Sequence, residues 1–148
     1  MDKYEGKEVV INSPSSVLFT SFSDLTQFAD RIPQEYREKV TVTKDSVKGE
    51  VNGMNMGLEV AQRIPNSKVV MKPQGGFPLD FSLVFDLKDV NPYQTSLKIS
   101  VETNLNFFTK AMFGSKIQQI VDKLSDQIAK SAAGGSFEKP DFSDIQNI

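Results

Sequence analysis

The sequence contains no cysteine, no histidine and no tryptophan. Without cysteine the chain has neither a disulfide framework nor thiolate chemistry. Without histidine it lacks the commonest general base and the commonest metal ligand, and Ser-His or Cys-His nucleophile pairs are excluded. Any catalysis would have to rest on Asp, Glu, Lys, Tyr or Arg, so an enzyme is the less favoured interpretation. We accordingly expect no catalytic residue, no metal and no cofactor.

Long apolar runs and an excess of positive charge are also missing. No stretch of about 18 apolar residues is present, so the sequence predicts no integral membrane segment. Residues 1–5 lack the apolar core of a secretory signal, which favours a cytoplasmic location. The 17 basic residues are interspersed with 19 acidic ones, and the excess of acid lies after Gly134. A neutral body without a basic stripe argues against nucleic acid as a partner.

At 148 residues the chain is long enough for one domain with a sizeable core. We expect that domain to span residues 1–133 and to be followed by a mobile acidic tail at residues 134–148. The tail has little that would fold alone, although Phe137, Phe142 and Ile145 could dock onto another surface.

The first part of the chain predicts one strand and two short helices. Residues 8–12 have the composition of a short strand. Ser13 is the expected N-cap of the first helix, with Pro14 at its first helical position, where the missing N–H does no harm. The apolar face of this helix would be formed by Val17, Leu18 and Phe22. Asp24 is expected to cap a second short helix, which Pro33 ends.

From residue 40 onward the apolar residues alternate, which predicts antiparallel strands. Asn52-Gly53 favours a tight hairpin, because a type I′ turn needs positive φ at both central positions. One face of the strand after it would contain Met54, Met56, Leu58, Val60 and Gln62, and the other face Glu59 and Arg63. Residues 65–67 are expected to turn the chain into a strand at residues 68–72, and residues 73–76 to form a flexible loop.

The clearest pattern runs from Phe77 to Leu105. Apolar side chains take the odd positions of two successive strands, and most of the residues between them are polar. Such alternation predicts a sheet with one dry face and one wet face. An amphipathic helix follows at residues 108–133, in which Gly114 is expected to cause a kink or to delay the start. Only this helix is long and apolar enough to cover the dry face.

The order of these elements predicts an α+β domain and resembles the helix-grip superfamily (SRPBCC). This superfamily includes START lipid-transfer domains, birch-pollen-allergen-like proteins and polyketide cyclases. The residues that carry the resemblance are the entry strand and first helix from Val9 to Leu18, the segment from Phe28 to Pro33, and the last strand and helix from Thr95 to Ala132. The resemblance implies a curved six- or seven-stranded antiparallel sheet wrapped around a long C-terminal helix, with two short helices after the first strand.

The same resemblance implies a cavity between sheet and helix that binds a hydrophobic small molecule such as a lipid, a quinone or a polyketide. Its predicted lining is Phe28, Met54, Met56, Leu58, Val60, Gln62, Phe77, Leu79, Phe81, Leu83, Phe85, Leu97, Ile99, Val101, Thr103, Met112, Ile117, Ile120, Val121 and Leu124. Within this set, Gln62 and Thr103 are the polar side chains suited to orient a ligand, unless the backbone satisfies them.

Three alternatives stay open at this point. The apolar face could simply be filled core, because phenylalanines on a covered sheet face are core in most proteins. The chain could be a protein-interaction module like the chaperone activators of the superfamily, which would give it a protein partner. It could also be a cyclase-like enzyme, which requires an ionisable side chain inside the cavity.

Overall fold

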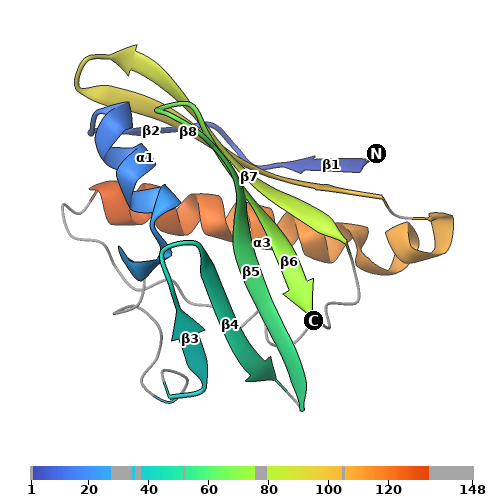
Figure 1. The fold of residues 1–148 in the computed structure, drawn as a ribbon. Coiled ribbons are helices and arrows are strands. Elements are labelled where there is room, and N and C mark those ends of the chain that lie inside the picture. The colour runs from blue at the N-terminus through green and yellow to red at the C-terminus, as the bar shows by residue number, and fades with distance from the viewer. Residues whose placement is uncertain are drawn as a thin grey trace.

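In the computed structural model, a strongly curved antiparallel sheet wraps around one long helix (Figure 1). The structure describes residues 2–27, 35, 38–51, 53–75, 80–104 and 106–133. The described strands are β1 (Asp2–Glu5), β2 (Val9–Ile11), β3 (Val40–Val42), β4 (Ser46–Val51), β5 (Met54–Ile64), β6 (Lys68–Gly75), β7 (Phe81–Asn91) and β8 (Gln94–Thr103). The described helices are α1 (Ser15–Ser23) and α3 (Phe107–Ala133). The predicted α+β fold, with its curved sheet and long C-terminal helix, is confirmed.

Eight strands are described, where the sequence predicted six or seven. They follow the order β1-β8-β7-β6-β5-β4-β3, and β2 pairs with the other half of β8. Asp2–Glu5 pair with residues 100–103 and Val9–Ile11 with residues 95–97, so β1 and β2 form one interrupted edge strand. Strand β1 was not predicted, because Asp-Lys-Tyr-Glu has no apolar alternation and is held in place by backbone pairing with β8.

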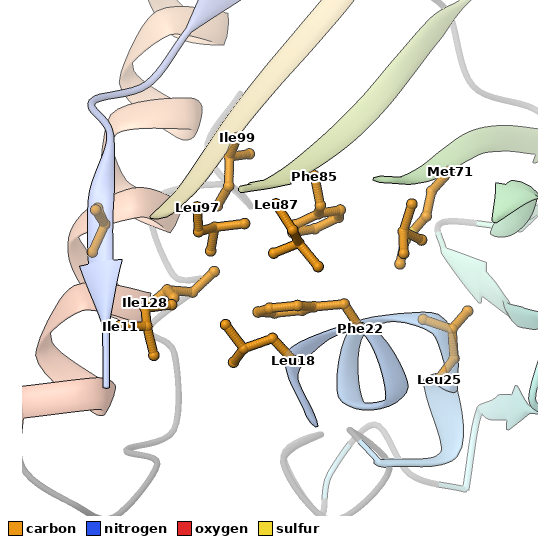
Figure 2. Close-up of a cluster of buried hydrophobic side chains, with 12 residues drawn as sticks. Ile11, Leu18, Phe22, Leu25, Met71, Phe85, Leu87, Leu97, Ile99 and Ile128 are labelled. Carbon is orange, nitrogen blue, oxygen red and sulfur yellow. The ribbon is translucent and has the colours of Figure 1, made fainter. Parts of the chain in front are cut away.

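The core lies on the inner face of the sheet, which is the face that both helices cover (Figure 2). Leu97 and Ile99 of β8 are each only 1% exposed. Helix α1 contributes Leu18 and Phe22, and the last turns of α3 contribute Ile128. The Phe22 ring stacks on Phe85 of β7 with 5.2 Å between the ring centroids. The end of the sheet where α1 and the end of α3 meet is therefore well packed.

The outer face is mostly polar, as the alternation predicted, but it contains a buried apolar pair. Val70 of β6 and Val84 of β7 are register partners and are 9% and 4% exposed. Lys68 and Asp86, the neighbouring partners on these strands, form an ion pair at 3.5 Å on the same face. The apolar stems of such long side chains can cover small valines on a solvated sheet.

At the β1 edge of the outer face, Glu5 lies between two lysines. Its carboxylate is 2.7 Å from the Lys98 ammonium and 3.1 Å from that of Lys3. Hydrogen bonds from Lys98 and from Lys3 lower the pKa of Glu5, and the bond to Glu5 raises the pKa of Lys3. These charges are exposed to solvent, so they help to fix the edge strand but add little to stability.

Strand β6 corrects the prediction of a flexible loop at residues 73–76. The strand continues through Pro73 to Gly75, and Pro73 is the register partner of Leu58 on β5. Pairing between β6 and β7 covers only residues 68–71 of β6, so the last part of β6 has β5 as its described partner. A proline is tolerated there because its missing N–H removes no ladder hydrogen bond on that side. Residue 76 lies outside the described residues.

The helices also differ in detail from the prediction. Pro14 takes the N-cap position of α1 in place of Ser13, and no side chain caps this end. Val17, predicted on the apolar face, is 52% exposed, whereas Leu18 and Phe22 are buried as predicted. Of the second short helix only one turn, at residues 25–27, is described. Helix α3 begins at Phe107 and continues through Gly114, so this glycine does not delay its start. The predicted tail at residues 134–148 lies outside the described residues.

The edge strand continues as a strap along α3. The Lys110 ammonium is 3.0 Å from the Asp2 carboxylate, and the Gln118 side-chain amide donates to the Glu5 carbonyl at 2.9 Å. Further along, Lys7 forms an ion pair with Asp126. Because the contacts on α3 advance in steps of about two turns, β1 and the residues after it run along one side of the helix.

Gly6 is a point of close approach between this strap and α3. A Cβ at residue 6 would overlap the Ser125 hydroxyl oxygen and lie 3.1 Å from Cγ1 of Val121. The positive-φ glycines of the described chain are Gly53 and Gly75, so the glycine at position 6 is required by space and not by its backbone angle. The strap can therefore approach α3 this closely only without a side chain.

We expect Gly6→Ala to lower the free energy of unfolding by about 1–3 kcal/mol, because the added methyl group overpacks the contact. Ser125→Ala alone should be nearly neutral, since the Ser125 hydroxyl donates only to the Val121 carbonyl one turn earlier. The double variant should recover most of the loss. Urea denaturation of the four proteins measures this coupling, and additive losses would contradict the contact.

Candidate functional site

The inner face carries a group of apolar side chains that are only partly buried. We call them the apolar strip; its members are Val42, Val47, Met56, Leu58, Val60 and Leu83. Pairing places them next to one another: Val42 with Val47 and Val47 with Leu58. Met71 lies between Val60 on one side and Leu83 on the other. The strip therefore extends the core sideways, from β7 to the β3 edge of the sheet.

Five of the six strip residues lie on β3, β4 and β5, and these stay partly exposed because the two described helices pack mainly on other strands. Helix α3 contacts chiefly β8, β1 and β2, and α1 contacts β6 and β7. On the helical side, Ile117, Ile120 and Leu124 of α3 are also only partly buried, whereas Val121 is fully buried. An apolar surface next to a buried core, which the described helices do not fully cover, is suited to contact a hydrophobic molecule.

The structure places the described members of the predicted lining in three environments. Buried in the core or under α3 are Phe85, Leu97, Ile99, Val101, Thr103 and Val121. Partly buried are Met56, Leu58, Val60, Phe81, Leu83, Ile117, Ile120 and Leu124. Exposed are Met54, Gln62 and Met112. Phe28, Phe77 and Leu79 lie outside the described residues. The second group lies where a ligand could make contact without displacing the core.

Gln62 was predicted on the inner face, and the structure corrects this. The β5–β6 register shifts between Val60 and Gln62, so residue 61 is the extra residue of a β-bulge. The bulge reverses the faces of the residues that follow. Gln62 now pairs with the outward-facing Val70, and Arg63 pairs with Val69, which is fully buried in the core. Arg63, predicted on the wet face, is the side chain that turns inward.

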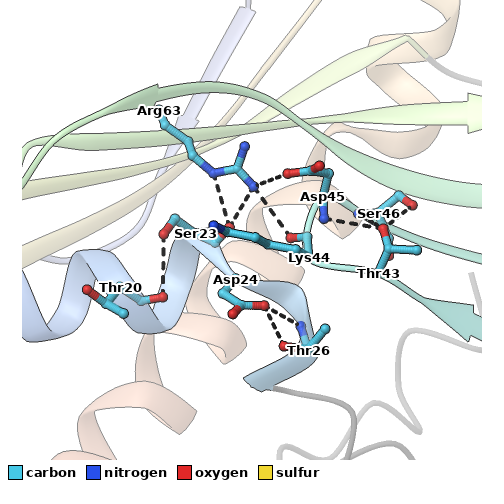
Figure 3. A network of polar contacts seen from close by, with 9 residues as sticks. All are labelled: Thr20, Ser23, Asp24, Thr26, Thr43, Lys44, Asp45, Ser46 and Arg63. Carbon is cyan, nitrogen blue, oxygen red and sulfur yellow. Dashed lines mark hydrogen bonds and ion pairs between the residues drawn. The ribbon is translucent and has the colours of Figure 1, made fainter.

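Arg63 uses this position to join α1 to the turn between β3 and β4 (Figure 3). Its guanidinium donates to the Ser23 carbonyl at the end of α1 at 2.8 and 3.1 Å. It also forms an ion pair with Asp45 at 2.6 Å. The backbone N–H of Leu25 donates to the Lys44 carbonyl at 3.0 Å and adds a second link. Arg63 thus fixes the end of α1 beside the strip, and sequence parity could not reveal this role.

Asp24 orders the chain directly after α1. Its carboxylate accepts hydrogen bonds from the Thr26 N–H at 3.0 Å and from the Thr26 hydroxyl at 2.5 Å. The hydrogen bond from the Thr26 hydroxyl is the main reason why the pKa of Asp24 lies below its ordinary value. The aspartate predicted to start the second helix therefore caps the described turn at residues 25–27.

The inward-facing threonines are satisfied by the backbone. The Thr103 hydroxyl donates to the Asp80 carbonyl at 2.6 Å, and the Thr95 hydroxyl donates to the Ser13 carbonyl at 2.7 Å. Both threonines are buried. Two polar side chains were expected to orient a ligand. The Thr103 hydroxyl is already used by its hydrogen bond to the Asp80 carbonyl, and Gln62 faces outward. Neither is available inside the strip.

Among the described residues, a metal site is absent, and the one hollow described below does not match the predicted cavity. No group of three or more acidic side chains among the described residues is placed to hold a metal ion. A hollow of about 560 Å³ lies near the β3–β4 edge, lined by Glu38, Lys39, Glu50 and Gly53. Its polar, open lining shares no residue with the predicted cavity. None of the helices that the structure describes is long and apolar enough to cross a membrane.

Similarity to known proteins is found in structure but not in sequence. No protein-family model matches the chain, and no curated protein matches it. The di-domain ARO/CYC protein BexL superposes with a TM-score of 0.65 at 9% identity, covering 90% of this chain and 47% of BexL. The Aha1 dimer from Colwellia psychrerythraea gives 0.61 at 16% identity, covering 89% and 96%. An HSP90 activator from Plasmodium falciparum gives 0.50 at 16% identity, covering 91% and 89%.

These likenesses establish the fold. The chain has a helix-grip fold, as its sequence predicted, and the cyclase and chaperone-activator branches named in that resemblance both appear among the structural neighbours. The chain spans about half the length of BexL and of DynU16, a protein of the dynemicin biosynthetic locus. A shared fold at such low identity does not transfer an activity, so the function has to be argued from the site.

Proposed function

We propose that the protein binds a hydrophobic small molecule, such as a lipid, a quinone or a polyketide-like compound, against the apolar strip. The observation that carries this proposal is the partial exposure of neighbouring apolar side chains on the inner face, next to the buried core. A surface that served only as core would be expected to lie under one of the helices. The proposal includes carriage or storage of the compound and assigns no catalytic residue.

The physical basis of binding would be burial of apolar surface. Each methylene group that leaves water contributes about 0.8 kcal/mol, and the strip offers aliphatic side chains from four strands. Arg63, a charged side chain that turns to the inner face, is already held by Ser23 and Asp45. The strip itself therefore favours the apolar body of a ligand over a charged group.

Native mass spectrometry of the freshly purified full chain, together with titration by the fluorescent fatty acid cis-parinaric acid, tests this proposal. We expect a co-purified small molecule or saturable binding of the probe with a dissociation constant in the micromolar range, about −8 kcal/mol. The absence of both would reject the proposal.

A second candidate, a protein-interaction module, is supported by exposed apolar residues at one end of the molecule. Val90 and Tyr93 lie at the tip of the β7–β8 hairpin and are 52% and 78% exposed. Val10 of the neighbouring β2 and Val17 of α1 are similarly exposed. Figure 1 shows this hairpin and α1 at the same end of the sheet. Aromatic residues in an exposed apolar group are typical of protein contacts.

If the protein is an interaction module, its structural likeness to an HSP90 activator makes an HSP90 chaperone the first partner to test. Isothermal titration of the full chain into a purified HSP90 chaperone would test it. Binding that Tyr93→Asp abolishes would support the interaction module, and heat changes equal to those of dilution would remove it.

A further inference from the structure

Tyr4 is the one aromatic side chain that β1 places on the inner face. It is the register partner of Val101, which is buried on that face. From there a single row of register partners crosses the sheet: Tyr4, Val101, Leu83, Met71 and Val60. Two members of this row, Leu83 and Val60, belong to the apolar strip. Tyr4 therefore stands at the far end of the row that leads from the strip to α3.

The Tyr4 hydroxyl is buried and has no hydrogen-bond partner among the described residues. A phenol is both a donor and an acceptor, and a buried phenol normally finds a partner. The other hydroxyl in this condition belongs to Ser100, which lies on the outer face opposite Glu5. Of these two hydroxyls, only that of Tyr4 lies on the face that carries the strip.

Gly114 leaves the space that this hydroxyl occupies. A Cβ at residue 114 would lie 3.0 Å from the Tyr4 oxygen, which is tighter than an ordinary contact. Glycine inside a helix is unfavourable relative to alanine, so its presence in the middle of α3 needs a local cause. The Tyr4 hydroxyl provides that cause, because its oxygen fills the space where a side chain at position 114 would begin. A phenylalanine at position 4 would have no oxygen there and would leave this space open.

Near the hydroxyl, one lysine is paired with an aspartate. Lys110 lies one helical turn before Gly114, and its ammonium is held by Asp2 at 3.0 Å. This bond to Asp2 raises the pKa of Lys110. Lys110 and Asp2 are therefore paired with each other, and neither is shown to pair with the hydroxyl. Recognition at this point would therefore depend on a hydrogen bond more than on charge.

We propose that the Tyr4 hydroxyl donates a hydrogen bond to a carbonyl oxygen at one end of the bound molecule, whose apolar body lies along the row toward the strip. The inference rests on the proposed function and makes it more specific. The ligand class is a hydrophobic compound with a ketone, quinone or carboxyl oxygen at one end, and a pure hydrocarbon binds less well. Tyr4 is thus a specificity residue of the ligand site.

A matched pair of ligands and a matched pair of variants test this hydrogen bond from the Tyr4 hydroxyl to the ligand, which we call the anchor. The ketone 9-fluorenone and the hydrocarbon fluorene share one skeleton and differ in the carbonyl group. We expect Tyr4→Phe to weaken fluorenone binding about fivefold to tenfold and to leave fluorene binding unchanged. Tyr93→Phe, at the exposed hairpin tip, should change neither affinity. The melting temperature of Tyr4→Phe should equal or exceed that of the wild type, because the change removes an unpaired buried hydroxyl.

Tyrosine NMR provides a second measurement that needs no variant of the site. The chain has three tyrosines, so labelling with 3-fluorotyrosine gives three ¹⁹F signals, and Tyr93→Phe and Tyr36→Phe assign them by elimination. We expect fluorenone to shift the Tyr4 signal more than fluorene does, with the Tyr93 signal unchanged.

The outcomes separate the anchor from the proposed function. If both compounds bind and Tyr4→Phe weakens neither, the anchor is wrong while binding of hydrophobic molecules stands. A fall of several degrees in the melting temperature of Tyr4→Phe would show that the hydroxyl already has a partner within the protein, and would also overturn the anchor. If neither compound binds the wild type, the proposed function fails, and the anchor fails with it.

Discussion

Phe22→Ala should lower the free energy of unfolding by about 3–5 kcal/mol. Phe22 is 3% exposed, and its ring stacks on Phe85 at an interplanar angle of 17°. Leu18 and Leu87 belong to the same buried cluster. Truncation would remove the stacked contact by which α1 covers β7 and would leave a cavity that a strand and a helix cannot easily close. Chemical denaturation followed by far-UV circular dichroism measures the loss.

Val17→Ala is the matched control for this variant. Val17 lies on the same helix but is 52% exposed, so its truncation should change the free energy of unfolding by no more than about 0.5 kcal/mol. A loss at Val17 as large as that at Phe22 would contradict the orientation of α1, and it would favour the apolar face that sequence periodicity predicted. Similar small losses at both sites would instead mean that α1 is not docked on the sheet.

Leu58→Glu should weaken cis-parinaric acid binding by at least about 100-fold, because it places a carboxylate in the middle of the surface that would contact the ligand. Leu58 is partly buried between Val47 and Pro73 on the inner face. A charged group that a ligand desolvates without a partner costs several kcal/mol, which is more than such a probe gains from a few methylene groups. Fluorescence titration of the purified variant measures the change in dissociation constant.

Gln62→Glu introduces the same carboxylate on the same strand and serves as the control. The bulge between Val60 and Gln62 turns residue 62 to the outer, exposed face, so the probe should bind this variant as it binds the wild type. Both variants should remain folded, because both positions are at least partly exposed. Equal loss of binding in the two variants would mean that the probe does not discriminate between the faces, and the strip would lose its assignment as the ligand surface.

The fold was predictable from the sequence because its largest signals are local. Alternation along β7 and β8, the turn at Asn52-Gly53 and the amphipathic pattern of α3 each depend on neighbouring residues. The turn is confirmed at Gly53, which has a φ of 79°, and by the pairing of Val51 with Met54. Strand β1 could not be predicted in this way, because its position depends on pairing with residues about 98 positions later in the chain.

The candidate site was less predictable, since face assignments by parity fail after a bulge. One extra residue at position 61 exchanges the roles of Gln62 and Arg63. The extension of β6 to Gly75 was likewise not predictable from Pro73 itself. It depends on a neighbouring strand that continues beside residues 72–75 after the pairing with β7 has ended at Met71. The Tyr4 hydroxyl was missed for a related reason: no local pattern marked β1 as a strand, so no side chain of it was assigned to a face.

The most direct test of the ligand surface is methyl NMR of the full chain, labelled at isoleucine, leucine and valine methyl groups, with and without saturating cis-parinaric acid. The account predicts that the largest shifts fall on Val47, Leu58, Val60 and Leu83 of the apolar strip, while Val10, Val17 and Val90 at the hairpin end stay in place. Shifts concentrated on those three valines, or no shifts at all, would contradict it.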